Sequence, residues 1–99
     1  VQSALELGVP VNTIAESVFA RSASSHPRLR AAAQQALSGP GGRAVDDVDR
    51  LVEDVRSALW ASKVVAYAQG LDHILAASEL YGWDVEIASV AKIWRAGCI

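Results

Sequence analysis

One arginine follows an apolar helical face, and it is the most informative residue for chemistry in this sequence. Ile14 and Val18 lie seven and three positions before Arg21, so the three side chains share one face. A guanidinium has a fixed fork of donors that matches a phosphate or a carboxylate, and an unpaired charge in an apolar setting is costly. The alternative is that Arg21 interacts with the dipole of its own helix, and position alone favours this alternative.

The segment that begins at this arginine, residues 21–43, is basic and holds no acidic residue. It also contains Arg28, Arg30 and Arg43, so one interpretation is an anion-facing patch. A solvated helix surface is the simpler explanation of Arg28 and Arg30. The whole chain has a formal charge of −2, which argues against a nucleic-acid partner because such partners favour a broad basic face.

The other ionisable residues lack the spacing of a metal site or a catalytic group. His26, His73 and the single cysteine, Cys98, do not have the ligand spacing of zinc sites, and no Ser-His-Asp or Cys-His arrangement is recognisable. A run of carboxylates lacks the glycine and terminal glutamate of a calcium loop and is ordinary at a helix start. This acidic run comprises Asp46, Asp47, Asp49, Glu53 and Asp54. We therefore assign no metal ligand and no catalytic residue to this chain.

The element that carries Arg21 is predicted to be a helix from about residue 11 or 13 to about residue 22. Thr13 and Glu16 fit a capping box at its start, in which each side chain satisfies a free backbone N–H group. No stretch of the chain alternates β-branched and polar residues as a strand would, so the predicted fold class is all-α.

Shorter helices are predicted on either side of it. The first ends at Gly8, a third runs from about residue 25 to 37 with Pro27 in its first turn, and a last helix spans about residues 86–95. The glycine-rich residues 38–42 form a connector, because they lack the preceding strand of a phosphate-binding loop.

A very long helix is predicted from about residue 46 to residue 81, opened by the acidic run and ended by Gly82. At 1.5 Å per residue it is about 50 Å long, which exceeds the diameter of a lone globule of this size. Either it breaks near Gly70 or it is the spine of a larger body. Polarity nearly vanishes over residues 58–75, so we expect other protein around it, with Lys63 and Gln69 hydrogen-bonded to a neighbouring helix end.

Composition is that of one packed domain or a piece of one. The 99 residues are 52% hydrophobic and 20% charged, so we expect a globule with a radius of gyration of about 13 Å. The longest apolar stretch is too short to span a bilayer, which argues against a membrane protein. Trp60, Trp83 and Trp94 are expected to anchor a core or an interface. The absence of Met and the helical first residues predict a fragment of a longer protein.

Three stretches of this all-helical chain closely resemble the decarboxylating 6-phosphogluconate dehydrogenases in order and spacing. The first ends in Val18-Phe19-Ala20-Arg21, the second ends in Tyr67-Ala68-Gln69-Gly70, and the third ends in Trp94-Arg95-Ala96-Gly97-Cys98-Ile99. The matching residues are 3–11, 14–21, 24–25, 53–56, 58–70, 81–83 and 93–99.

This resemblance implies that residues 1–99 are part of the family's large C-terminal helical domain, without its N-terminal dinucleotide-binding domain and C-terminal tail. It implies a cytoplasmic homodimer that oxidises 6-phosphogluconate with NADP and releases carbon dioxide to give ribulose 5-phosphate. That reaction belongs to the pentose phosphate pathway and to gluconate utilisation. The family's catalytic Lys and Glu lie upstream of residue 1, so the chain alone is expected to be inactive.

The resemblance also bears on the arginine. In the family, the Arg that closes the Val-Phe-Ala-Arg motif contacts the sugar phosphate, so the resemblance implies that Arg21 binds the substrate. The implied role of Arg21 is to position the substrate, because a phosphate held at one end of the sugar acid orients the distant reacting carbon.

Two alternatives remain open. One is a non-catalytic helical dimerisation or docking module, which would use the apolar excess and the three tryptophans as its contact surface. The other is a related β-hydroxyacid dehydrogenase, although the long helix and the Trp-Arg-Ala-Gly-Cys-Ile ending resemble the 6-phosphogluconate enzymes specifically.

Overall fold

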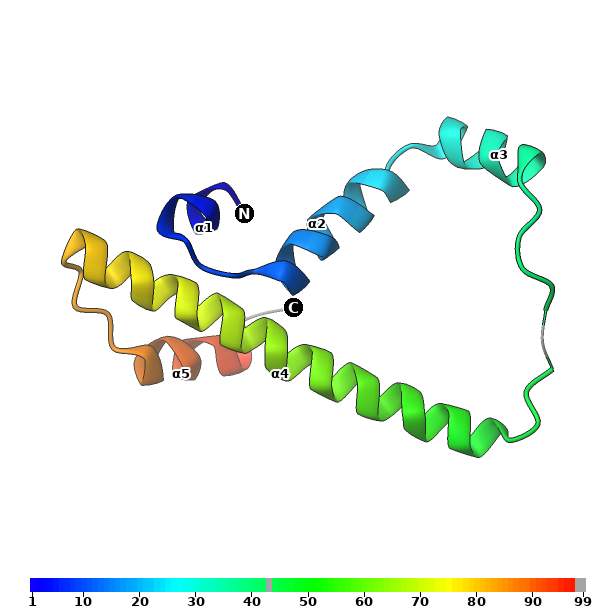
Figure 1. Ribbon diagram of the computed structural model, residues 1–99. Helices are drawn as coiled ribbons and strands as arrows, with labels where there is room; N and C mark the ends of the chain where they lie inside the picture. Colours follow the sequence, from blue (N-terminus) through cyan, green and yellow to red (C-terminus); the bar gives the residue numbers. More distant parts are fainter. Residues whose placement is uncertain (43, 98–99) are drawn as a thin grey trace.

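The structure, a computed structural model, describes residues 1–42 and 44–97, and these residues contain five helices and no strand (Figure 1). The all-α prediction is confirmed. The helices are α1 (Gln2–Leu7), α2 (Asn12–Ser24), α3 (Pro27–Ala36), α4 (Val48–Tyr81) and α5 (Ile87–Gly97).

Four of the helix ends lie where the residue types predict them. Gly8 and Gly82 close α1 and α4 in the left-handed conformation, with φ angles of 69° and 66°, which only glycine adopts without cost. Pro27 is the first residue of α3, where its missing N–H group has no partner to lose. Asp47 caps α4 by accepting a hydrogen bond from the backbone N–H of Arg50.

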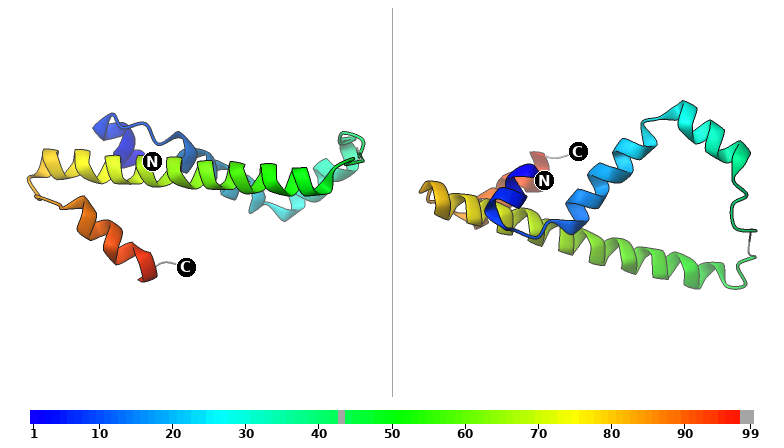
Figure 2. Two further views of the ribbon diagram at one scale, coloured as in Figure 1. Left: turned by 90° about the horizontal axis from the view of Figure 1, so that it is seen from below. Right: turned by 45° about the horizontal axis from the view of Figure 1, so that its top comes forward.

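The long helix is continuous, so the alternative of a break near Gly70 is wrong. Its 34 residues correspond to about 51 Å, close to the molecule's longest dimension of 53 Å. Figure 2 shows it as one straight spine along the molecule.

Three helices, α1, α2 and α5, lie beside the C-terminal half of this spine (Figure 1). Both α1 and α2 pack against α4, and α5 turns back along it, with the Trp94 ring edge-on to Tyr67 at 6.2 Å between ring centroids. From its N-terminal end, α2 runs obliquely away from α4, and α3 lies beyond the far end of α2, away from the spine (Figures 1 and 2).

The chain is not the compact globule that its composition suggested. Its radius of gyration is 18.7 Å, against about 13 Å for a packed domain of this length. Its accessible surface is 8518 Å², against about 5,400 Å² for a compact domain of this mass. The physical reason is the straight spine, whose N-terminal half extends beyond the helices that pack on it. Large apolar side chains stay exposed there, including Leu59 at 69% and Trp60 at 68%.

Candidate functional site

Arg21 lies in the last turn of α2 and is exposed. The apolar face that precedes Arg21 is covered only at its start. Ile14 is half-buried, but Val18 and Phe19 are 50% and 60% exposed. The reason is geometric, because α2 meets α4 at Thr13 and Ile14 and then runs outward (Figure 1).

Neighbouring hydroxyl groups bind the carbonyl groups at the end of α2. The Ser24 hydroxyl donates to the Arg21 carbonyl oxygen at 2.9 Å, and the Ser25 hydroxyl donates to the Ser22 carbonyl oxygen at 2.7 Å. Within residues 1–42 and 44–97, the guanidinium group of Arg21 has no ion pair and no hydrogen bond. It is therefore an exposed cation with five free donors among the described residues, suited to an external anion.

A single long-range hydrogen bond fixes the start of α2. The Gln69 side-chain oxygen, on α4, accepts from the backbone N–H of Thr13 at 3.0 Å. The predicted capping box of Thr13 and Glu16 is therefore wrong: α2 begins at Asn12, and the amide from α4 occupies the Thr13 N–H group. The prediction that Gln69 bonds to a neighbouring helix end is confirmed, whereas Lys63 is exposed.

Apolar contacts surround this hydrogen bond. An ideal Cβ placed on Gly70 would lie 4.0 Å from the Ile14 Cδ1 atom, so Ile14 packs over the glycine. Val11, just before α2, is 6% exposed. An open hollow beside this junction is lined by Ile14, Ala66, Tyr67, Gly70 and Trp94. Its mainly apolar lining suits packing.

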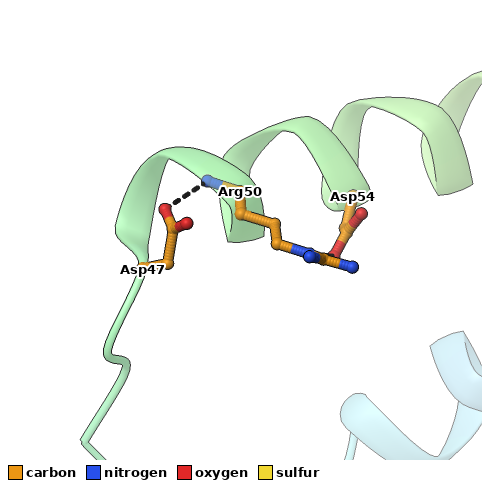
Figure 3. Close-up of polar contacts among 3 residues, drawn as sticks. All are labelled: Asp47, Arg50 and Asp54. Atoms are coloured by element: carbon orange, nitrogen blue, oxygen red, sulfur yellow. Dashed lines mark hydrogen bonds and ion pairs between the residues drawn. The ribbon is translucent and has the colours of Figure 1, made fainter.

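The acidic run serves the start of α4. Asp47 caps the helix, Asp49 lies in its first turn, and Asp54 pairs with Arg50 at 4.0 Å between charged atoms (Figure 3). Glu53 makes the corresponding pair with Arg56 at 3.0 Å. Carboxylates at this end offset the positive pole of the helix dipole, which explains the acidic run without a ligand.

The other candidates for chemistry are dispersed. Arg28 and Arg30 are exposed on α3, His26 is exposed just before α3, and His73 is half-buried on α4. Arg43 and Cys98 lie outside the described residues. Within residues 1–42 and 44–97, no three His, Cys, Asp or Glu side chains come together as a metal-binding group.

Two of the three tryptophans make aromatic contacts within the chain, whereas Trp60 is exposed. Trp83 stacks on Tyr81 at 4.9 Å between ring centroids, and Trp94 meets Tyr67. None of the helices in the described part of the chain has both the length and the apolar character needed to cross a bilayer.

Sequence reasoning missed the partner of Gln69 and the role of Gly70. The signal for Gln69 was present as a polar residue in an apolar stretch, but its partner is 56 positions away. The signal at Gly70 was interpreted as a possible break, whereas the glycine is where Ile14 approaches the spine.

The fold defines a class of protein: an all-α domain built along one long helix. Comparison with known proteins identifies the family within this class. The family model described as 6-phosphogluconate dehydrogenase, C-terminal domain, matches residues 1–99, and the chain belongs to this family.

Relatives from three bacteria agree with this assignment. The chain is 52% identical over 98 residues to the 6-phosphogluconate dehydrogenase, decarboxylating, of Shigella flexneri. It is 51% identical to that of Escherichia coli (strain K12) and 50% identical to that of Klebsiella pneumoniae, each over 98 residues. Each alignment covers 99% of this chain and 21% of the relative, so the chain spans about a fifth of the length of these proteins.

Proposed function

We propose that this chain is part of a longer enzyme that oxidatively decarboxylates 6-phosphogluconate to ribulose 5-phosphate with NADP. The support is the family match over residues 1–99 and relatives at 50–52% identity that carry the name of this enzyme. The enzyme acts in the cytoplasm, in the pentose phosphate pathway and gluconate utilisation.

Within that enzyme, Arg21 binds the phosphate group of the substrate. The observation that carries this role is the exposed guanidinium at the end of α2, unpaired within the described residues, while serine hydroxyls bind the nearby carbonyl oxygens. A guanidinium can bind two phosphate oxygens at once, which fixes the orientation of the sugar acid as well as its affinity. The reacting carbon lies at the other part of the ligand, so Arg21 positions the substrate and takes no part in bond breaking.

The nucleotide does not fit the residues of this chain. Its glycine-rich segment, residues 38–42, joins α3 to α4 and follows no strand, whereas a dinucleotide site needs a strand, a glycine turn and a helix N-terminus. We therefore assign NADP binding and the catalytic pair to parts of the enzyme outside residues 1–99, and derive no chemical step here.

The rest of the chain provides scaffold. The spine exposes apolar side chains over its N-terminal half, and the accessible surface exceeds that of a compact domain by about 3,000 Å². We propose that other helices of the same domain and a second subunit cover this surface, in a homodimer.

The test is to replace Arg21 by Ala in the full-length enzyme. Loss of a charged hydrogen-bond pair costs about 2–3 kcal/mol, so KM for 6-phosphogluconate should rise about 30-fold or more, while KM for NADP stays within about twofold. Arg28→Ala, which removes an exposed arginine from α3, is the matched control and should leave both values unchanged. Unchanged sugar kinetics in Arg21→Ala would remove Arg21 from the site.

The alternative is a non-catalytic docking module. It explains the exposed apolar surface but does not explain the match to a dehydrogenase domain. The coding sequence upstream of residue 1 discriminates between them. A strand followed by a G-x-G-x-x-G or G-x-A-x-x-G turn favours the enzyme, and a stop codon or an unrelated domain favours the module.

A further inference from the structure

We propose that Gln69 is a positioning residue for the phosphate site: its side-chain amide on α4 holds the start of α2 and thereby sets where Arg21 meets the substrate. This inference rests on the proposed role of Arg21. It adds a residue on a different helix, 48 positions from that arginine, to the determinants of substrate affinity.

The first observation is that α2 has no cap of its own. Its N-cap residue is Val11, which has no side-chain acceptor, so the N–H groups of the first turn depend on partners from elsewhere. The Gln69 oxygen supplies one of them, at 3.0 Å from the Thr13 nitrogen. Both residues are half-buried, so water replaces this acceptor less freely than it would on an open surface.

The second observation is where α2 is held. At its N-terminal end, Thr13 meets Gln69 and Ile14 meets Gly70 on the spine. Further along, Val18 and Phe19 are at least half exposed. Figures 1 and 2 show the helix leaving the spine from this anchored end. The adjacent residues Gln69 and Gly70 therefore combine a directed polar contact with a packing contact on the same turn of α2.

Because α2 is held at its start, a change in its tilt there displaces its far end. Arg21 lies eight residues after Thr13, which is about 12 Å along the helix. A tilt of about 10° at the anchored end moves the arginine by about 2 Å. Misplacement of about 1 Å is enough to impair a positioned contact severely, so a small change at Gln69 reaches the phosphate site.

The experiment uses four variants of the full-length enzyme: Gln69→Leu, Gln69→Glu, Arg21→Ala and the double variant Gln69→Leu with Arg21→Ala. Leu removes the acceptor at similar size, and Glu keeps an oxygen in the same place. Gln35→Leu, which changes an exposed glutamine on α3, is the matched control. The readouts are KM for 6-phosphogluconate and for NADP, kcat, and hydrogen exchange at the Thr13 amide.

Gln69→Leu should raise KM for 6-phosphogluconate about tenfold. KM for NADP should stay within twofold, exchange at Thr13 should accelerate, and Gln69→Glu should restore the wild-type KM. In the Arg21→Ala background, Gln69→Leu should change KM for 6-phosphogluconate by less than a further twofold, because α2 then carries no contact to the phosphate. A purely structural role would raise KM by the same factor in both backgrounds.

Three outcomes overturn the proposed role of Gln69: an unchanged sugar KM in Gln69→Leu, an equal effect in both backgrounds, or no rescue by Gln69→Glu. Failure of the underlying function is seen separately, because Arg21→Ala alone would then leave the sugar KM unchanged while Thr13 exchange still responds to Gln69→Leu.

Discussion

Glu86 and Ser89 illustrate how single side chains organise this chain. The Glu86 carboxylate accepts a hydrogen bond from the backbone N–H of Ser89 at 2.9 Å and another from the Ser89 hydroxyl. The hydroxyl is the main cause, and the backbone N–H groups of Ser89 and Ala88 a further cause, of a pKa of Glu86 below its ordinary 4.5. The ionised carboxylate thus holds the first turn of α5.

The pH dependence follows from this lowered pKa. The stabilisation is fully present above pH 4.5 and is lost as the pH falls through the lower pKa of the folded chain. Replacing Ser89 by Ala should move the Glu86 titration midpoint upward, toward its ordinary value. NMR titration of labelled glutamate in the full-length enzyme measures this shift. Ser62→Ala, which removes a hydroxyl bonded within α4, should leave the midpoint unchanged, and an unchanged midpoint in Ser89→Ala would contradict the assignment.

The sequence alone did not predict every contact of individual side chains. The start of α2 shows why: Thr13 and Glu16 satisfy the local capping pattern, but an amide 56 positions away occupies the Thr13 N–H group. A local motif gives no information about which distant residue competes for the same donor. The exposure of Arg21 was unpredictable for a similar reason, because it depends on the direction in which α2 leaves the spine.

Among the helices, α4 has two well-defined ends. Asp47 caps its start and Gly82 ends it, and both were predictable because capping preferences depend on the local sequence. Its continuity through Gly70 was harder to predict, because a glycine lowers helix propensity by about 1 kcal/mol, and neighbouring residues can outweigh that. Here Gln69 and Gly70 are where α2 packs against the spine.

Two aspartates at the start of α4 should differ in their effect. Asp47→Ala removes the cap and should cost about 1 kcal/mol of local stability, so the Arg50 amide should exchange about fivefold faster in the full-length enzyme. Asp54→Ala removes an ion pair of 4.0 Å whose side chains are 71% and 80% exposed, and should cost less than about 0.5 kcal/mol. Hydrogen exchange measures both, and equal effects would show that charge rather than capping holds this end.

At the scale of the whole molecule, the chain resembles a frame rather than a globule. The order of the helices was predicted correctly from the sequence. The compact core that the composition predicted is not formed by this chain. Burial depends on which helices meet, and a straight spine of 34 residues reaches past its neighbours in this chain. Trp60 and Leu59 are accordingly exposed, although their types favour the interior.

This architecture predicts the behaviour of the isolated 99-residue chain. It should show no reduction of NADP in the presence of 6-phosphogluconate, because the proposed nucleotide site and catalytic pair lie outside it. It should also associate in solution, because its exposed apolar surface is larger than monomers usually carry. An absorbance assay and analytical ultracentrifugation check the two statements. A compact monomer would contradict the proposed covering of the spine, and turnover would contradict the division of roles.

The proposed contact between Arg21 and the phosphate is tested by comparing the binding of ligands with and without that group. Equilibrium binding of 6-phosphogluconate and of gluconate is measured for the full-length enzyme and for Arg21→Ala. If Arg21 binds the phosphate, the variant should lose affinity for 6-phosphogluconate by about 30-fold or more and keep its affinity for gluconate. Equal losses for both ligands, or no loss for either, would contradict it.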